Sequence, residues 1–230
     1  MFGRIKSGNS ALAPLLMVIN GLSLYAGAAI AVGLFENLPP VLVAWLRIST
    51  AAVILVVLFR PRMRDFLGRT GFNAAVYGIS TLAMNMTFYE AIARLPMGTA
   101  VAIEFLGPIT VAALGSRTLR DWAALILAGI GVVIISGAQW SANSVGVLFA
   151  LAAAVLWALY IVAGNRIASS AQDSQTGMTV GFFWAALLAA PLTLWLWPGM
   201  SNLGMAPVSL LGLAFGLGVL SAVIPYGLDL

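Results

Sequence analysis

The sequence contains no cysteine and no histidine. Their absence excludes disulfide frameworks, thiol catalysis, Cys/His metal sites and the usual histidine proton shuttle. Charged residues are also scarce, at 8% of the chain against about 25% in soluble globular domains. We therefore expect no metal site and no cofactor, and any proton transfer inside the molecule would fall to carboxylates.

Hydrophobic side chains take the place of the missing charges. They make up 62% of the 230 residues, and the mean hydropathy is +1.04. A membrane-spanning helix needs about 20 apolar residues. The chain has four long uncharged runs, and the last two are each long enough for two spans: Ser7–Phe35, Thr70–Tyr89, Trp122–Asn165 and Ser174–Leu228. The composition excludes a soluble enzyme and indicates a multi-pass membrane protein.

Helices are the predicted spanning elements, because lipid-exposed backbone must satisfy its own hydrogen bonds and no barrel-type alternation occurs. The sequence predicts an all-α bundle of eight transmembrane helices, near residues 11–34, 41–59, 71–93, 96–116, 121–138, 145–164, 177–197 and 207–228.

Basic residues lie almost entirely in alternate loops. Nine Lys and Arg residues fall in one set of loops, and only Arg94 falls in the other. This asymmetry predicts a cytoplasmic amino terminus and assigns the basic residues to topology rather than to nucleic-acid binding.

Three charged residues fall inside predicted spans: Arg47, Glu90 and Glu104. A charge in the bilayer centre costs about 2.5 to 3.5 kcal/mol or more, so each should face the bundle interior and find a partner. For Arg47 we expect pairing with Glu104 first; capture of a substrate carboxylate and snorkelling to the interface are alternatives. Glu90 and Arg94 have the spacing of a structural i,i+4 pair.

Glu104 is the leading functional candidate. Pro108 lies four residues later and cannot donate to its carbonyl, and Gly107 lies beside that proline. Broken helices of this kind expose backbone groups to the substrate or ion of a transporter. We expect Glu104 to bind substrate or carry a proton, or simply to be part of a buried ion pair.

A polar stripe follows one face of the third predicted span: Tyr77, Thr81, Asn85 and Tyr89. Such a stripe faces a cavity or a neighbouring helix. Tyr25 on the first span, with Trp157 and Tyr160 on the sixth, could complete the lining. This inventory would suit a zwitterionic amino acid, although cationic or neutral metabolites would also fit a carboxylate beside an aromatic wall.

Several segments resemble the EamA-type drug/metabolite transporters, most of all the threonine/homoserine exporter family. The most specific is Ala100-Val-Ala-Ile-Glu-Phe-Leu-Gly-Pro108, and others are Ala44-Trp-Leu-Arg47, Asn85-Met-Thr-Phe-Tyr89 and Leu156-Trp-Ala-Leu-Tyr160. The resemblance implies an inner-membrane carrier of ten spans, built from two inverted five-span repeats, that exports small metabolites, in this branch threonine and homoserine.

On this resemblance, residues 5–138 form the first repeat and residues 139–230 form a second repeat that stops after its third helix. The family's last two spans would then be missing, and a partner chain, such as a second copy in a homodimer, would complete the carrier. The alternative expectation is an inactive truncated fragment.

The expected function is export of small amino acids by alternating access, with proton coupling through Glu104. No P-loop pattern is present, so an ion or substrate gradient would supply the energy. A broader drug or metabolite exporter is the alternative. An integral-membrane enzyme is disfavoured, because Asp65, Asp121 and Asp173 stand alone in predicted cytoplasmic loops.

Overall fold

The computed structural model describes residues 12–116, 118–136, 143–168, 174–198 and 204–225. These residues form helices and no strands, which confirms the predicted all-α fold. In chain order the helices are α1 (Leu12–Leu34), α2 (Pro40–Phe59), the 3-10 helix η1 (Met63–Phe66), α3 (Gly68–Ile92), α4 (Met97–Glu104), α5 (Leu106–Gly115), α6 (Leu119–Ser136), α7 (Ser144–Ala168), α8 (Ser174–Trp195), α9 (Pro207–Gly218) and the π-helix η3 (Val219–Val223).

Each of the eight predicted spans corresponds to a helix or to two consecutive helices. The fourth span is split into α4 and α5, and the eighth continues from α9 into η3. Four segments of the described chain are long and apolar enough to cross a membrane: Pro40–Phe59, Met97–Gly115, Ser144–Asn165 and Ser174–Trp195. Two further apolar segments are shorter, Val18–Leu34 and Pro207–Val223.

Prolines mark the beginnings of several helices. Pro40 and Pro207 occupy the first turn of α2 and α9. Backbone amides in the first turn have no acceptor within the helix, so the missing amide hydrogen of proline costs no hydrogen bond there. The end of α2 is equally defined, because Arg60 adopts the left-handed conformation with φ 48° and its amide donates to the carbonyl of Val56. The chain then turns through η1 into α3.

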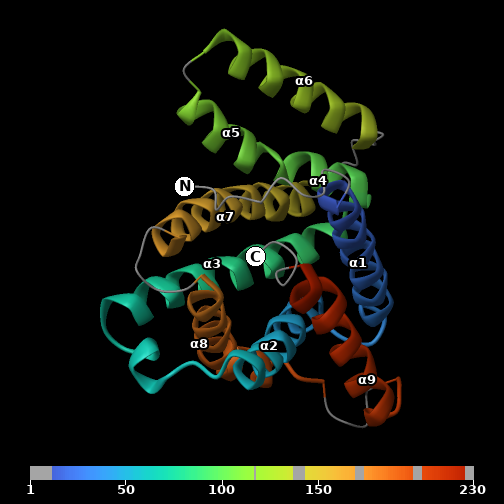
Figure 1. Ribbon diagram of the computed structural model, residues 1–230. Coiled ribbons are helices and arrows are strands. Elements are labelled where there is room, and N and C mark those ends of the chain that lie inside the picture. Colours follow the sequence, from blue (N-terminus) through green and yellow to red (C-terminus); the bar gives the residue numbers. More distant parts are fainter. Residues whose placement is uncertain (1–11, 117, 137–142, 169–173, 199–203, 226–230) are drawn as a thin grey trace.

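Helix α3 lies at the centre of the bundle and packs against α7, α8 and α2 (Figure 1). The approach to α8 is close, since a methyl group on Gly78 would overlap the backbone of Gly181. Small residues permit such contacts in membrane bundles. Gly181 and Ala185, one turn apart on α8, are both buried and therefore belong to a packing surface.

Two groups of helices flank this centre. The α4–α6 group packs against α7 through α4 and α5, with α6 outermost, and α1, α9 and η3 pack against α2 and against one another (Figure 1). Helices from both predicted repeats thus pack against each other, as α3 does with α7 and α8. The boundary between repeats at residue 138 and their inverted relation stay predictions.

Candidate functional site

Arg47 forms the polar centre of the bundle. It extends from α2, between turns whose residues Ala44, Ile48 and Ala51 are buried. Its Nη1 donates to Asn85 Oδ1 at 2.6 Å and to the Tyr89 hydroxyl at 3.4 Å, and its Nη2 donates to the carbonyl oxygen of Ser221 at 2.5 Å. One side chain therefore connects α2, α3 and η3.

The Ser221 carbonyl is free to accept Arg47 because of Pro225. In an α-helix the amide four residues later would occupy this carbonyl, and proline has none. The backbone widens here into η3, in which the Ile224 amide donates to Val219, five residues back. The carbonyl of Leu220 is released as well, and it accepts a 2.5 Å hydrogen bond from Ser23 Oγ of α1.

Ser221 is the residue that the sequence reasoning missed. The signal was present: Pro225 stands in the same relation to Ser221 as Pro108 does to Glu104. Gly27 adds to the contact, since a methyl group there would lie 2.5 Å from the Ser221 Cβ atom. π-helical turns are rare in proteins, and those that occur are frequently found at functional sites.

Glu104 lies at the last residue of α4, and its side chain is 7% exposed. The predicted helix break is present, but it falls at Phe105, between α4 and α5. Gly107 and Pro108 lie within the first turn of α5. Gly107 serves packing rather than flexibility, because a methyl group on it would overlap the carbonyl of Ala154 in α7.

The predicted ion pair between Arg47 and Glu104 is wrong. Within the described ranges, ion pairs join Arg64 to Asp65 and Arg94 to Glu90. Arg47 is committed to α3 and η3, while α4 packs against α7 and α6.

The polar stripe of α3 faces the bundle interior, as predicted. Tyr77, Thr81, Asn85 and Tyr89 are all buried. Thr81 Oγ1 donates to the carbonyl of Tyr77 at 2.8 Å, and Asn85 Nδ2 donates to the carbonyl of Thr81 at 2.7 Å. The second bond orients the amide so that Asn85 Oδ1 points to Arg47. Thr81 therefore supports Asn85 rather than contacting Arg47.

The aromatic candidates on α7 belong to two different contacts. Tyr160 lies beside Tyr77, with the hydroxyl groups 3.3 Å apart and the ring centroids 5.0 Å apart. Trp157 packs edge-on against Phe105 at the helix break, with centroids 5.1 Å apart. Tyr25 lies in α1, and its side chain is outside the described part of the structure.

Glu90 and Arg94 form the predicted i,i+4 pair on α3. Arg94 also lies over the Phe149 ring of α7, 5.2 Å from its centroid. Both contacts fasten the end of α3, so this pair is structural. No group of three or more His, Cys, Asp or Glu residues is placed to hold a metal ion in the regions that the structure describes.

Known proteins resemble this chain over most of its length. The threonine/homoserine exporter RhtA of Salmonella typhimurium (strain SL1344) is 31% identical over 226 residues, covering 94% of this chain and 72% of the relative. Its namesake in Escherichia coli (strain K12) is 30% identical over 225 residues, with the same coverage. This chain belongs to the EamA-type transporter family.

The uncharacterized transporter YvbV of Bacillus subtilis (strain 168) is also similar, at 30% identity over 148 residues, or 57% of this chain and 48% of the relative. No family model and no solved structure matches the chain. As an EamA-type protein, the chain is a transporter rather than an enzyme. It is a multi-pass inner-membrane protein that handles a small-molecule substrate.

Proposed function

We propose that this EamA-type transporter exports small zwitterionic amino acids of the threonine and homoserine type. The observation that carries the proposal is that the half-buried guanidinium of Arg47 and the buried carboxyl group of Glu104 both lie outside the ion pairs found among the described residues. A zwitterion carries one charge to complement each group, so it would neutralise both at once.

The substrate carboxylate would bind at Arg47. Its guanidinium is engaged by neutral acceptors only, Asn85, Tyr89 and the Ser221 carbonyl, so its positive charge has no direct counter-ion there. Its Nε atom is buried and has no acceptor among the described residues. Nε and Nη2 form the edge of a guanidinium that binds carboxylates with two parallel hydrogen bonds.

The substrate ammonium group would bind at Glu104. Next to this carboxyl group, the Phe105–Trp157 contact supplies an aromatic wall that favours a cation. Tyr160 would face the remainder of the substrate and could bond a side-chain hydroxyl. Specificity for threonine and homoserine is supported by the names of the RhtA relatives.

Transport would follow alternating access with the amino terminus in the cytoplasm. Carriers with central sites often use discontinuous helices, and this chain has two, α4/α5 and α9/η3. A proton on Glu104 would compete with the substrate ammonium group, which would couple export to a proton gradient. A broader drug or metabolite exporter differs from this proposal in the shape of the cavity alone.

Export of labelled threonine from cells tests the proposal. Glu104→Gln should reduce export to the level of an empty vector, because the amide carries no charge and does not ionise to release or take up a proton. Glu90→Gln is the matched control, since it removes a carboxylate from the structural pair with Arg94 and should leave most export intact. Membrane insertion must be equal in all strains.

Full export by well-inserted Glu104→Gln would contradict the role of Glu104. Export of cationic dyes in place of amino acids would favour the broader exporter.

A further inference from the structure

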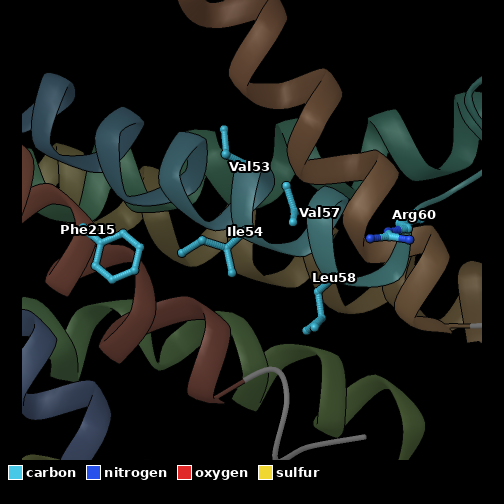
Figure 2. A pocket seen from close by; sticks show the side chains of 6 residues that line it. All are labelled: Val53, Ile54, Val57, Leu58, Arg60 and Phe215. Carbon is cyan, nitrogen blue, oxygen red and sulfur yellow. The ribbon is translucent and has the colours of Figure 1, made fainter.

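A groove of about 640 Å³ lies on the outside of the bundle between α2 and α9. Its lining is apolar along most of its length and charged at one end. Figure 2 shows Arg60 at one end and the Phe215 ring at the other, with four aliphatic side chains of α2 between them. Those four are Val53, Ile54, Val57 and Leu58.

The apolar part of the groove faces outward. Val53, Val57, Leu58 and Phe215 are each more than half exposed, at 65%, 66%, 64% and 57%. From residue 53 to residue 60 the helix axis rises roughly 10 Å, the length of a good part of a fatty acyl chain. The groove thus offers an apolar lining to part of an acyl chain.

The charged end has a cation without a counter-ion. Arg60 is exposed and belongs to none of the ion pairs found among the described residues. Arg62 and Arg64 follow it, and the nearby acid, Asp65, is already engaged by the Arg62 amide and by Arg64. This end therefore carries a net positive charge.

We propose that the groove binds an anionic phospholipid, with its phosphate at Arg60 and one acyl chain along α2 toward Phe215. A soluble anion would leave the apolar lining unused, and a zwitterionic lipid would bring no net charge to Arg60. Basic pockets between membrane helices on the cytoplasmic side bind anionic head groups. The predicted topology puts the Arg60 loop on that side. This lipid site is separate from the substrate site and does not depend on the identity of the exported molecule.

Thermal unfolding of the purified full chain in detergent, with added lipid, tests the charged end. Phosphatidylglycerol should raise the unfolding temperature, because a ligand of the folded state stabilises it, and phosphatidylcholine should not. Arg60→Gln should weaken phosphatidylglycerol binding about fivefold, the effect of one arginine near a membrane surface. Arg120→Gln is the matched control, since Arg120 is exposed and basic but belongs to α6, which packs against α4 and α5 and does not line the groove.

Equal stabilisation by both lipids, or an equal loss in both variants, would overturn the proposal. Stabilisation by glycerol phosphate alone would assign Arg60 to a soluble anion instead.

A second pair of variants tests the apolar part. Val57→Trp fills the groove and should abolish the phosphatidylglycerol effect. Val155→Trp enlarges a residue of similar exposure on α7, 62% against 66%, outside the groove, and should keep the effect. Unchanged lipid binding in Val57→Trp would contradict an acyl-chain site. If Val57→Trp instead abolished a concentration-dependent dimer without any lipid effect, the groove would belong to a second copy and the lipid proposal would be wrong.

Discussion

The two helix breaks of this transporter have the same local cause and different structures. Pro108 removes the amide that would bond the carbonyl of Glu104, and Pro225 does the same to Ser221. At the first break the chain forms two helices that meet at Phe105. At the second it widens into a π-helix whose freed carbonyls accept hydrogen bonds from Arg47 and Ser23.

The difference lies in what surrounds each proline. Donors from α1 and α2 reach the second break, so its wide turn is held by side chains from distant parts of the sequence. The first break is instead held by a backbone-to-backbone contact, because Gly107 of α5 lies directly against the carbonyl of Ala154 in α7. At these two sites a proline frees a carbonyl and the neighbouring helices set the form of the opening, whereas Pro191 lies inside α8 without breaking it. Each contact can be tested with a variant and a matched control.

Gly107→Ala should have the largest effect. The added methyl group meets a backbone carbonyl that cannot rotate away, so α5 and α7 must separate, and the free energy of unfolding should fall by about 3 kcal/mol. The control is Gly115→Ala in the same helix, which meets nothing within 4 Å and should be neutral or slightly stabilising. Unfolding in detergent measures both. Equal stability of the two variants would contradict a backbone contact at the first break.

Arg47→Lys should have the next largest effect. Lysine keeps the charge but lacks the planar fork that directs Nη1 to Asn85 and Nη2 to the Ser221 carbonyl, so we expect the loss of one charged hydrogen bond worth about 2 kcal/mol. Arg94→Lys is the control, because it changes an arginine in the exposed pair with Glu90. An unfolding free energy unchanged by Arg47→Lys would show that the two hydrogen bonds of the guanidinium do not stabilise η3.

Gly27→Ala should destabilise the second break by about 1.5 kcal/mol, since the new methyl group meets the Ser221 Cβ atom. Ser221→Gly removes that atom, so the double variant should recover most of the loss in a double-mutant cycle. Gly33→Ala, with nothing within 4 Å in the same helix, is the control. Purely additive effects would mean that the two positions do not touch.

Ser23→Ala should have the smallest effect, about 0.6 kcal/mol, typical of one interhelical hydrogen bond in a membrane protein. It removes the donor to the Leu220 carbonyl but leaves Arg47 in place. Ser80→Ala is the control, because Ser80 is partly exposed and its hydroxyl donates to the carbonyl of Val76 in its own helix. A loss as large as that of Arg47→Lys would show that Ser23, rather than Arg47, holds the π-helix.

Much of the fold follows from the sequence, because a membrane helix forms all its backbone hydrogen bonds within itself. Its position can therefore be predicted from the length and hydropathy of an apolar run. All eight predicted spans correspond to helices, and the Glu104 break was predicted within one residue of its place at Phe105. The interior position of the α3 stripe followed from its four-residue spacing. The packing role of Gly107 could not be predicted from the sequence. A glycine is usually taken as a point of flexibility, and its packing role is known only once the atom opposite it is known, here the Ala154 carbonyl.

The sequence by itself determined the helices, the burial of Glu104, and the loss of an amide donor to the carbonyls of Glu104 and Ser221. These depend on residues within one or two turns of each other. Only the tertiary structure decided which groups meet. Arg47 binds a carbonyl 174 positions away at Ser221 instead of pairing with Glu104, because α2 packs beside η3 while α4 packs against α7. The partner of a buried charge depends on how helices pack, and no local pattern in the sequence records that.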